Sequence, residues 1–150
     1  MISMVIIFSQ IQIVLPSLVP ITMQTLGIYL IGLILNIKES LFCVCVYLLM
    51  GLMGLPVFSG FQGGLSCFMG PSGGFLWSFI VMVMMIRALK KQPLVGLIFA
   101  TITSYLMGMC WFSFILETNL RAAFYSCILP FLLGDSFKIY LAYKISFHLK

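Results

Sequence analysis

The sequence predicts an all-α polytopic membrane protein in which six spanning helices form one bundle. Hydrophobic residues make up 63% of the 150 residues and charged residues only 7%, which is too little charge to cover the surface of a soluble domain. The apolar residues fall into runs separated by short interruptions, and a spanning helix needs about 20 residues. We therefore expect residues 1–150 to form a single integral membrane domain.

The apolar runs define the expected spans in order. They are Ile2 to Leu15, Ile21 to Ile37, Ser40 to Leu55, Phe75 to Leu89, Leu94 to Leu116 and about Gly134 to Leu149. The first run is the weakest because it contains Gln10 and Gln12, and a start upstream of Met1 is an alternative. No Lys or Arg precedes this run, which favours a retained first span over a cleaved signal peptide.

The Lys and Arg residues predict the orientation of the bundle. Six of the eight lie between spans two and three, between spans four and five, or at the end of the chain: Lys38, Arg87, Lys90, Lys91, Lys144 and Lys150. With six spans, these places share one side, which the positive-inside rule makes cytoplasmic. We expect both termini in the cytoplasm and membrane lipid around the bundle. Because the cations form no stripe, we expect no nucleic-acid partner.

This topology brings three unusual segments together on the outer side: residues Pro16 to Pro20, Pro56 to Gly74, and the start of the last helix. The second segment contains two prolines and six glycines but no charge, so it cannot be one continuous helix. Irregular backbone at membrane depth persists only where it is buried in protein or lines a cavity. We therefore predict a re-entrant-like loop between helices three and four that faces a ligand, with a plain tight turn as the alternative.

Asp135 and Lys138 form an ionisable pair inside the last apolar run. A charge near the bilayer centre costs about 2.5–3.5 kcal/mol on insertion scales, so membrane proteins keep such residues where they pair or contact a ligand. The spacing of three places both on one helix face, where they could simply neutralise each other. Pro130 and Gly134 favour a ligand, because a helix breaker and a flexible joint would bring the pair to the outer cavity.

Metal binding and catalysis find little support in the sequence. The cysteines lack the spacing of metal ligands and are expected to be buried thiols; they are Cys43, Cys45, Cys67, Cys110 and Cys127. Asp135 could be the acid or base of an intramembrane enzyme, but it has no paired nucleophile or second carboxylate. A Walker-type phosphate loop is also absent from the sequence. We expect no enzyme activity, no cofactor and no metal.

Three motifs resemble those of the BioY family, the biotin-specific substrate-binding (S) components of energy-coupling factor transporters. They are Val19-Pro-Ile-Thr-Met-Gln-Thr-Leu-Gly27, Gly54-Leu-Pro-Val-Phe-Ser-Gly60 continuing through Gln62-Gly-Gly64 to Gly70-Pro-Ser-Gly-Gly74, and Pro130-Phe-Leu-Leu-Gly-Asp-Ser-Phe-Lys138. The resemblance covers nearly the whole chain. It implies a six-helix membrane protein that binds biotin on its outer face for uptake. The implied partners are a transmembrane coupling (T) subunit and two cytoplasmic ATPases.

The resemblance also implies which residues bind biotin. They are Asp135 and Lys138 in the last helix, Gln62 in the glycine-rich loop, Gln24, and the Gly70, Pro71 and Ser72 backbone. Biotin offers two ureido N–H donors, a carbonyl acceptor, an apolar thioether ring and a carboxylate, which suits a site of acids, amides and a lysine. Candidates to wall the ring are Phe61, Phe68, Phe75 and Trp111, although ordinary packing is the alternative for each.

Four positions depart from the family pattern. Family members commonly have a small residue at Phe61, Asn at Gln62, Tyr at Phe75 and Pro at Leu133. The longer amide arm of Gln62 and the missing hydroxyl at Phe75 change the polar contacts that are available. An S component for a different vitamin is therefore the alternative to one for biotin.

Overall fold

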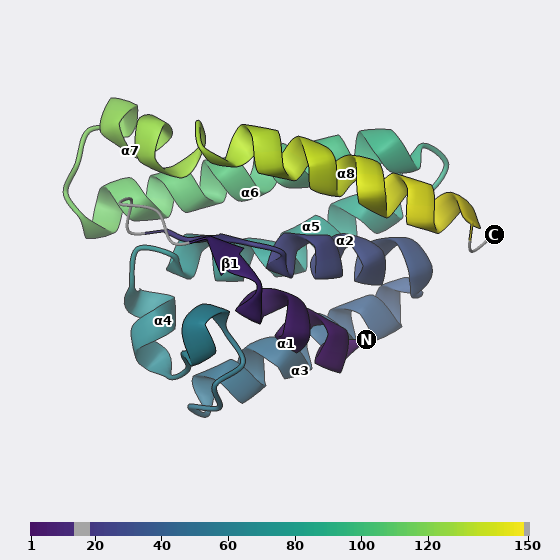
Figure 1. Ribbon diagram of the computed structural model, residues 1–150, viewed down its shortest axis with the longest axis horizontal. Helices are drawn as coiled ribbons and strands as arrows, with labels where there is room; N and C mark the ends of the chain where they lie inside the picture. Colours follow the sequence, from purple (N-terminus) through teal and green to yellow (C-terminus); the bar gives the residue numbers. More distant parts are fainter. Residues whose placement is uncertain (14–18, 149–150) are drawn as a thin grey trace.

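The computed structural model describes residues 1–13 and 19–148, which are mostly helical (Figure 1). The elements in order are α1 (Ile2–Gln10), β1 (Gln12–Ile13), β2 (Ile21–Thr22), α2 (Gln24–Ile34), α3 (Ile37–Leu52), the 3-10 turn η1 (Ser59–Phe61), α4 (Leu65–Met69), α5 (Gly73–Ala88), α6 (Pro93–Ile115), α7 (Leu120–Cys127) and α8 (Phe131–His148). Helix therefore occupies much of each of the six predicted spans.

The helices pack as a bundle with α2 and α5 in its middle. In Figure 1, α6 and α8 lie on one side of this pair, and α1 and α3 lie on the other. The chain enters α1 and leaves α8 at the same end of the molecule, whereas α4, α7 and the strands gather at the opposite end, which we call the loop end. Large side chains such as Tyr29, Tyr47 and Met82 are fully buried between the helices.

Local signals fix where two of the helices begin. Asn36 caps α3 through a capping box, in which the Glu39 side chain accepts a hydrogen bond of 3.1 Å from the Asn36 backbone N–H. This box places Lys38 and Glu39 in the first turn of the helix, so α3 begins before the predicted Ser40. Pro93 begins α6, at a position where a missing N–H costs nothing.

The prediction of helix is wrong near the end of the first predicted span and at the start of the second. Gln12–Ile13 and Ile21–Thr22 are short antiparallel strands, with Gln12 opposite Thr22, because a short apolar run does not distinguish a strand from a helix. Residues 14–18 of the predicted outer connection lie outside the described residues.

The predicted last helix begins slightly earlier than expected, at Phe131, and a shorter helix precedes it. The axes of these two helices, α7 and α8, differ by 50° across a short break. Pro130 lies in this break, which agrees with its predicted role as a helix breaker. The bend brings the start of α8 to the loop end (Figure 1).

Helix length alone supports fewer than six membrane spans. Within the described residues, α6 is long and apolar enough to cross a membrane, and α7 with α8 qualifies as a bent pair. Two further apolar helices, α2 and α5, are shorter than a full crossing. The count of six spans therefore stays a prediction.

The prediction of five buried thiols is wrong. Cys127 is buried, but Cys45 and Cys110 are exposed and the other two are intermediate, and all five are free. Cys45 lies on an outward face of α3 that also carries the exposed Phe42 and Leu49. Because the outward faces of this bundle are apolar too, an apolar run does not reveal which of its residues point inward.

Candidate ligand-binding site

A cavity at the loop end is lined by residues from the segments that the sequence predicted to converge. Pro20 reaches it from the first connection and Thr22 from β2, and residues of the Pro56–Gly74 loop, α2, α5, α6 and α8 complete the lining. Six of the predicted site residues are in this lining: Gln24, Gln62, Ser72, Phe75, Asp135 and Lys138. The structure thus confirms that Gln62 and Asp135 lie at one cavity.

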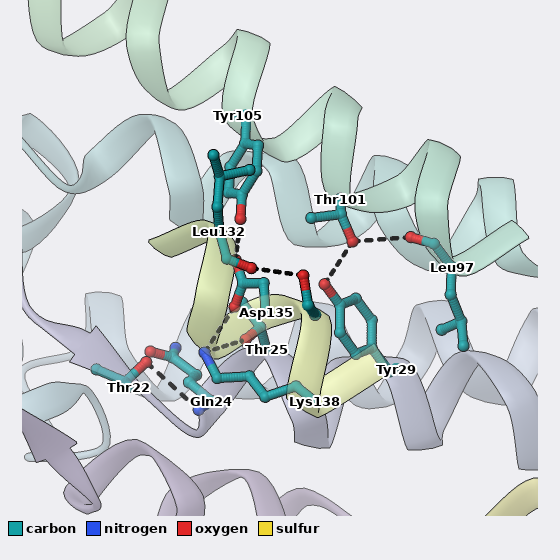
Figure 2. A network of polar contacts seen from close by, with 11 residues as sticks. Thr22, Gln24, Thr25, Tyr29, Leu97, Thr101, Tyr105, Leu132, Asp135 and Lys138 are labelled. Carbon is teal, nitrogen blue, oxygen red and sulfur yellow. Dashed lines mark hydrogen bonds and ion pairs between the residues drawn. The ribbon is translucent and has the colours of Figure 1, made fainter. Parts of the chain in front are cut away.

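The two charged residues of α8 form a buried ion pair at this cavity (Figure 2). Nζ of Lys138 lies 2.7 Å from Oδ1 of Asp135, and the residues are only 3% and 4% exposed. Removing two charges from water is costly, and their attraction compensates for it only when further hydrogen bonds satisfy the remaining polar atoms.

Two residues that the sequence analysis missed supply those further hydrogen bonds. Tyr105 of α6 donates its hydroxyl proton to Oδ2 of Asp135 at 2.6 Å, and Lys138 donates to Oγ1 of Thr25 in α2 at 3.1 Å. Three helices therefore meet at the pair. An ammonium group has three donors; among the described residues, Lys138 has partners for two of them, which leaves the third for a ligand.

Gln24 is held with its amide in a defined orientation. Its side chain is 5% exposed, and Nε2 donates to the hydroxyl of Tyr47 at 2.8 Å, which in turn donates to the carbonyl of Val57 at 3.0 Å. This chain of hydrogen bonds joins α2, α3 and the loop. One N–H of Nε2 is used in this way, and Oε1 of Gln24 is the atom that can accept a hydrogen bond from a ligand.

Gln62 lies at a more open part of the cavity. Its side chain is exposed, and Oε1 lies 4.0 Å from Sγ of Cys67, a weak contact in which the thiol donates. Burial raises the pKa of the Cys67 thiol, so the sulfur stays protonated at neutral pH. The amide of Gln62 is therefore available to a ligand without breaking a strong bond.

Aromatic rings form two walls of the cavity, and glycines make room for them. Phe75 stacks on Phe131 with ring centres 6.1 Å apart, and a Cβ on Gly108 would lie 2.3 Å from Cζ of Phe75. Phe58 fits against Gly51 in the same way, where a Cβ would lie 2.0 Å from its ring. Any side chain at either glycine would push a wall ring out of place.

Hydroxyl groups line the cavity along α6. Thr101, Ser104 and Tyr105 share one face of this helix; Oγ1 of Thr101 lies 2.6 Å from the Tyr29 hydroxyl, and Oγ of Ser104 lies 2.9 Å from that of Ser78. Helical spacing of polar residues inside an otherwise apolar run is the signal that could have identified this face from the sequence.

Other predicted site residues do not line the cavity. Phe61 is 72% exposed, and Gly70 and Pro71 lie just outside the lining, where the Gly70 carbonyl accepts a hydrogen bond of 3.0 Å from Nε1 of Trp111. Phe68 packs behind Phe58, with ring centres 5.4 Å apart. For Phe68 and Trp111, the structure favours the alternative of ordinary packing.

Comparisons with known proteins agree with this geometry. The model of the BioY family matches residues 1–150. The chain is 32% identical to biotin transporter BioY2 of Lactococcus lactis subsp. cremoris, over 81% of this chain and 71% of that protein. It is 37% identical to a probable biotin transporter BioY of Bacillus subtilis, over 85% and 75% of the two chains.

A solved structure is similar throughout. It is the S-component for biotin from an ECF-type ABC transporter, which superposes with a TM-score of 0.91 at 29% identity and covers 99% of this chain and 85% of that one. The predicted resemblance and the bundle architecture are thus confirmed at the level of family and fold.

Proposed function

The chain belongs to the BioY family over residues 1–150, and we propose that it binds biotin and takes it up as the S component of an energy-coupling factor transporter. The observation that carries the proposal is the buried Asp135–Lys138 pair at a cavity that Gln24 and Gln62 also line. The relatives named biotin transporters and the similar S-component for biotin support the choice of ligand.

The polar groups of the site complement the polar groups of biotin. Oδ atoms of Asp135 and Oε1 of Gln24 accept hydrogen bonds from the two ureido N–H groups, and Gln62 contributes an amide that can donate or accept. The remaining N–H of Lys138 donates either to the ureido oxygen or to the tail carboxylate. Because Asp135, Lys138 and Gln24 are held by Tyr105, Thr25 and Tyr47, these three side chains lose little conformational entropy on binding.

The apolar groups of the site suit the bicyclic ring. Phe58 and Phe75 give it two aromatic surfaces, and Phe131, which also lines the cavity, stacks on Phe75. Burial of a thioether ring against such surfaces is favourable at about 25 cal/mol per Å². Ser72 lines the same cavity, whereas Gly70, Pro71 and Phe61 would reach the ligand only after the loop rearranges.

The proposal places the protein in the cytoplasmic membrane, with six spans and both termini inside. In Figure 1, the start of α1, the end of α8 and the α2–α3 and α5–α6 connections lie at one end, away from the loop end that holds the cavity. Lys90 and Lys91 are in the α5–α6 connection, and Lys38 lies in the first turn of α3 directly after the α2–α3 connection, which supports a cytoplasmic location for this end. The energy for uptake would come from ATP hydrolysis by two ATPase subunits, which a T subunit couples to this chain.

Competition binding tests the ligand. Purified protein in detergent is incubated with labelled biotin and then with unlabelled biotin, desthiobiotin or other vitamins. We expect unlabelled biotin to displace the label at the lowest concentration. If another vitamin displaces it at a lower concentration, the chain is an S component for that vitamin; if no label is retained by folded protein, the biotin proposal is wrong.

Uptake tests the partners. Cells that lack biotin uptake receive this chain alone or together with T and ATPase subunits. We expect labelled biotin to accumulate fastest with all components and to stop when the ATPase is inactivated. Equal accumulation with and without a functional ATPase would contradict the proposed partners.

A further inference from the structure

The loop that carries Gln62 is held in place by the last residue of α1. Nε2 of Gln10 donates to the carbonyl of Phe58 at 3.0 Å, and Oε1 of Gln10 accepts a hydrogen bond of 2.9 Å from the backbone N–H of Phe61. One side-chain amide therefore joins the two ends of the η1 turn. We call these two hydrogen bonds the Gln10 bridge.

Neighbouring hydrogen bonds fix the same backbone. Ser9, which is fully buried, has its hydroxyl oxygen 2.7 Å from the carbonyl of Val57 and 2.9 Å from Nε2 of Gln10. On the far side of the turn, Phe58 N–H donates to the carbonyl of Gln62 at 3.0 Å. The position of Gln62 thus depends on a turn that is tied to α1.

The bridged backbone has an unfavourable conformation. Gly60 and Phe61 both have positive φ, at 69° and 56°. Glycine adopts this region freely, but an aromatic residue does so only where its surroundings hold it there. The Gln10 bridge holds the N–H of Phe61, while the Phe61 side chain points outward and is 72% exposed.

We propose that Gln10 is a positioning residue for ligand binding. It keeps Phe61 in the left-handed conformation, which directs the next residue, Gln62, to the cavity. This inference rests on the proposed function, because it concerns the same cavity. This role also explains why the apolar first helix contains a polar residue: the Gln10 amide forms hydrogen bonds with backbone groups about fifty residues later in the chain.

A positioning role differs from a general stabilising role in one measurable way. If Gln10 acts through Gln62, removal of Gln10 weakens the binding of biotin only while the Gln62 amide is present. If Gln10 merely stabilises the bundle, its removal weakens binding equally with Gln62 or with alanine at that position. A double-mutant cycle separates these two cases.

The experiment measures biotin affinity and dissociation rate for wild type, Gln10→Ala, Gln62→Ala and the double variant. We expect Gln10→Ala to weaken binding about tenfold, mainly through faster dissociation, and to have almost no further effect when combined with Gln62→Ala. Gln10→Glu keeps an acceptor for Phe61 N–H but loses the donor to Phe58, so we expect an intermediate loss. Unchanged affinity of Gln10→Ala, or an equal loss in both backgrounds, would overturn the proposal.

Hydrogen exchange provides a readout that needs no ligand. We expect the Phe61 amide to exchange faster in Gln10→Ala than in wild type and to stay protected in Gln12→Ala. Gln12 is the matched control: its side chain lies beside Gly60 but makes no hydrogen bond to the described residues. If the wild type fails to bind biotin but the Phe61 amide behaves as expected, the proposed ligand is wrong and the bridge is real. If that amide exchanges equally in all three proteins, the bridge is wrong whatever the ligand.

Discussion

The hydroxyl of Tyr105 donates a hydrogen bond of 2.6 Å to Oδ2 of Asp135, while Lys138 pairs with the other carboxylate oxygen of the same residue. The carboxylate is thus held from two sides, by α6 and by its own helix. A buried charge pair is stable only when such additional hydrogen bonds are present. Tyr105 is therefore part of the site together with the two charged residues that the sequence revealed.

Replacing Tyr105 with Phe removes this hydrogen bond and keeps the ring. A hydrogen bond to a charged group contributes about 1.5–3 kcal/mol, so we expect a lower free energy of unfolding by that amount and biotin affinity reduced about tenfold. Thermal unfolding and calorimetric titration measure the two effects. Tyr140→Phe is the control because Tyr140 is exposed. If Tyr105→Phe matches this control in both measurements, the hydroxyl does not orient Asp135.

Replacing Asp135 alone should lower stability more than replacing Asp135 and Lys138 together. Asp135→Leu leaves a buried ammonium without its partner, which destabilises a protein by about 3–5 kcal/mol. In Asp135→Leu/Lys138→Met no charge remains, so we expect stability to recover while biotin binding is still lost. Thermal unfolding and biotin binding are compared for the single and double variants. Retention of binding by the folded double variant would mean that the pair is only structural.

Gly108 should not tolerate a methyl group. A Cβ there would lie 2.3 Å from the Phe75 ring, so Gly108→Ala displaces a cavity wall and we expect destabilisation of about 1–3 kcal/mol. Combining it with Phe75→Leu should restore part of this loss. Gly134→Ala is the matched control for thermal unfolding, because the nearest atom would be 3.7 Å away. Equal melting temperatures for the two alanine variants would show that the Phe75 ring is not fixed by Gly108.

Biotin should protect Cys67 from alkylation. This thiol lines the cavity and lies next to Gln62, and burial raises its pKa, so its alkylation should be slow at neutral pH and accelerate at a higher pH than that of a free thiol. We expect saturating biotin to slow it further, as measured by mass spectrometry of the modified peptides. Cys110, which is exposed and outside this cavity, provides the internal control. Equal slowing of both cysteines, or of neither, would contradict the position of the ligand.

The sequence predicted which segments meet at the cavity better than it predicted where the helices and strands begin and end. Asp135, Lys138 and the charge-free glycine loop were identifiable because an ionisable pair and a broken backbone are both unusual in apolar sequence. The strands at Gln12 and Thr22 were missed because two residues are too few to show a period.

The supporting residues of the site could not be read from the sequence in the same way. Tyr105 and Thr25 are ordinary residues in apolar helices, and their roles follow from which helices become neighbours. Phe61 was expected at the ligand, but the left-handed backbone of its turn points the ring outward. A turn conformation of this kind depends on a distant partner, here Gln10, and no local pattern indicates it.

Isothermal titration of the purified protein with biotin tests the central claim most directly. We expect saturable binding of one biotin per chain, with an affinity that falls sharply in the folded Asp135→Leu/Lys138→Met variant. The absence of binding to folded wild-type protein, or equal affinity of the two proteins, would contradict it.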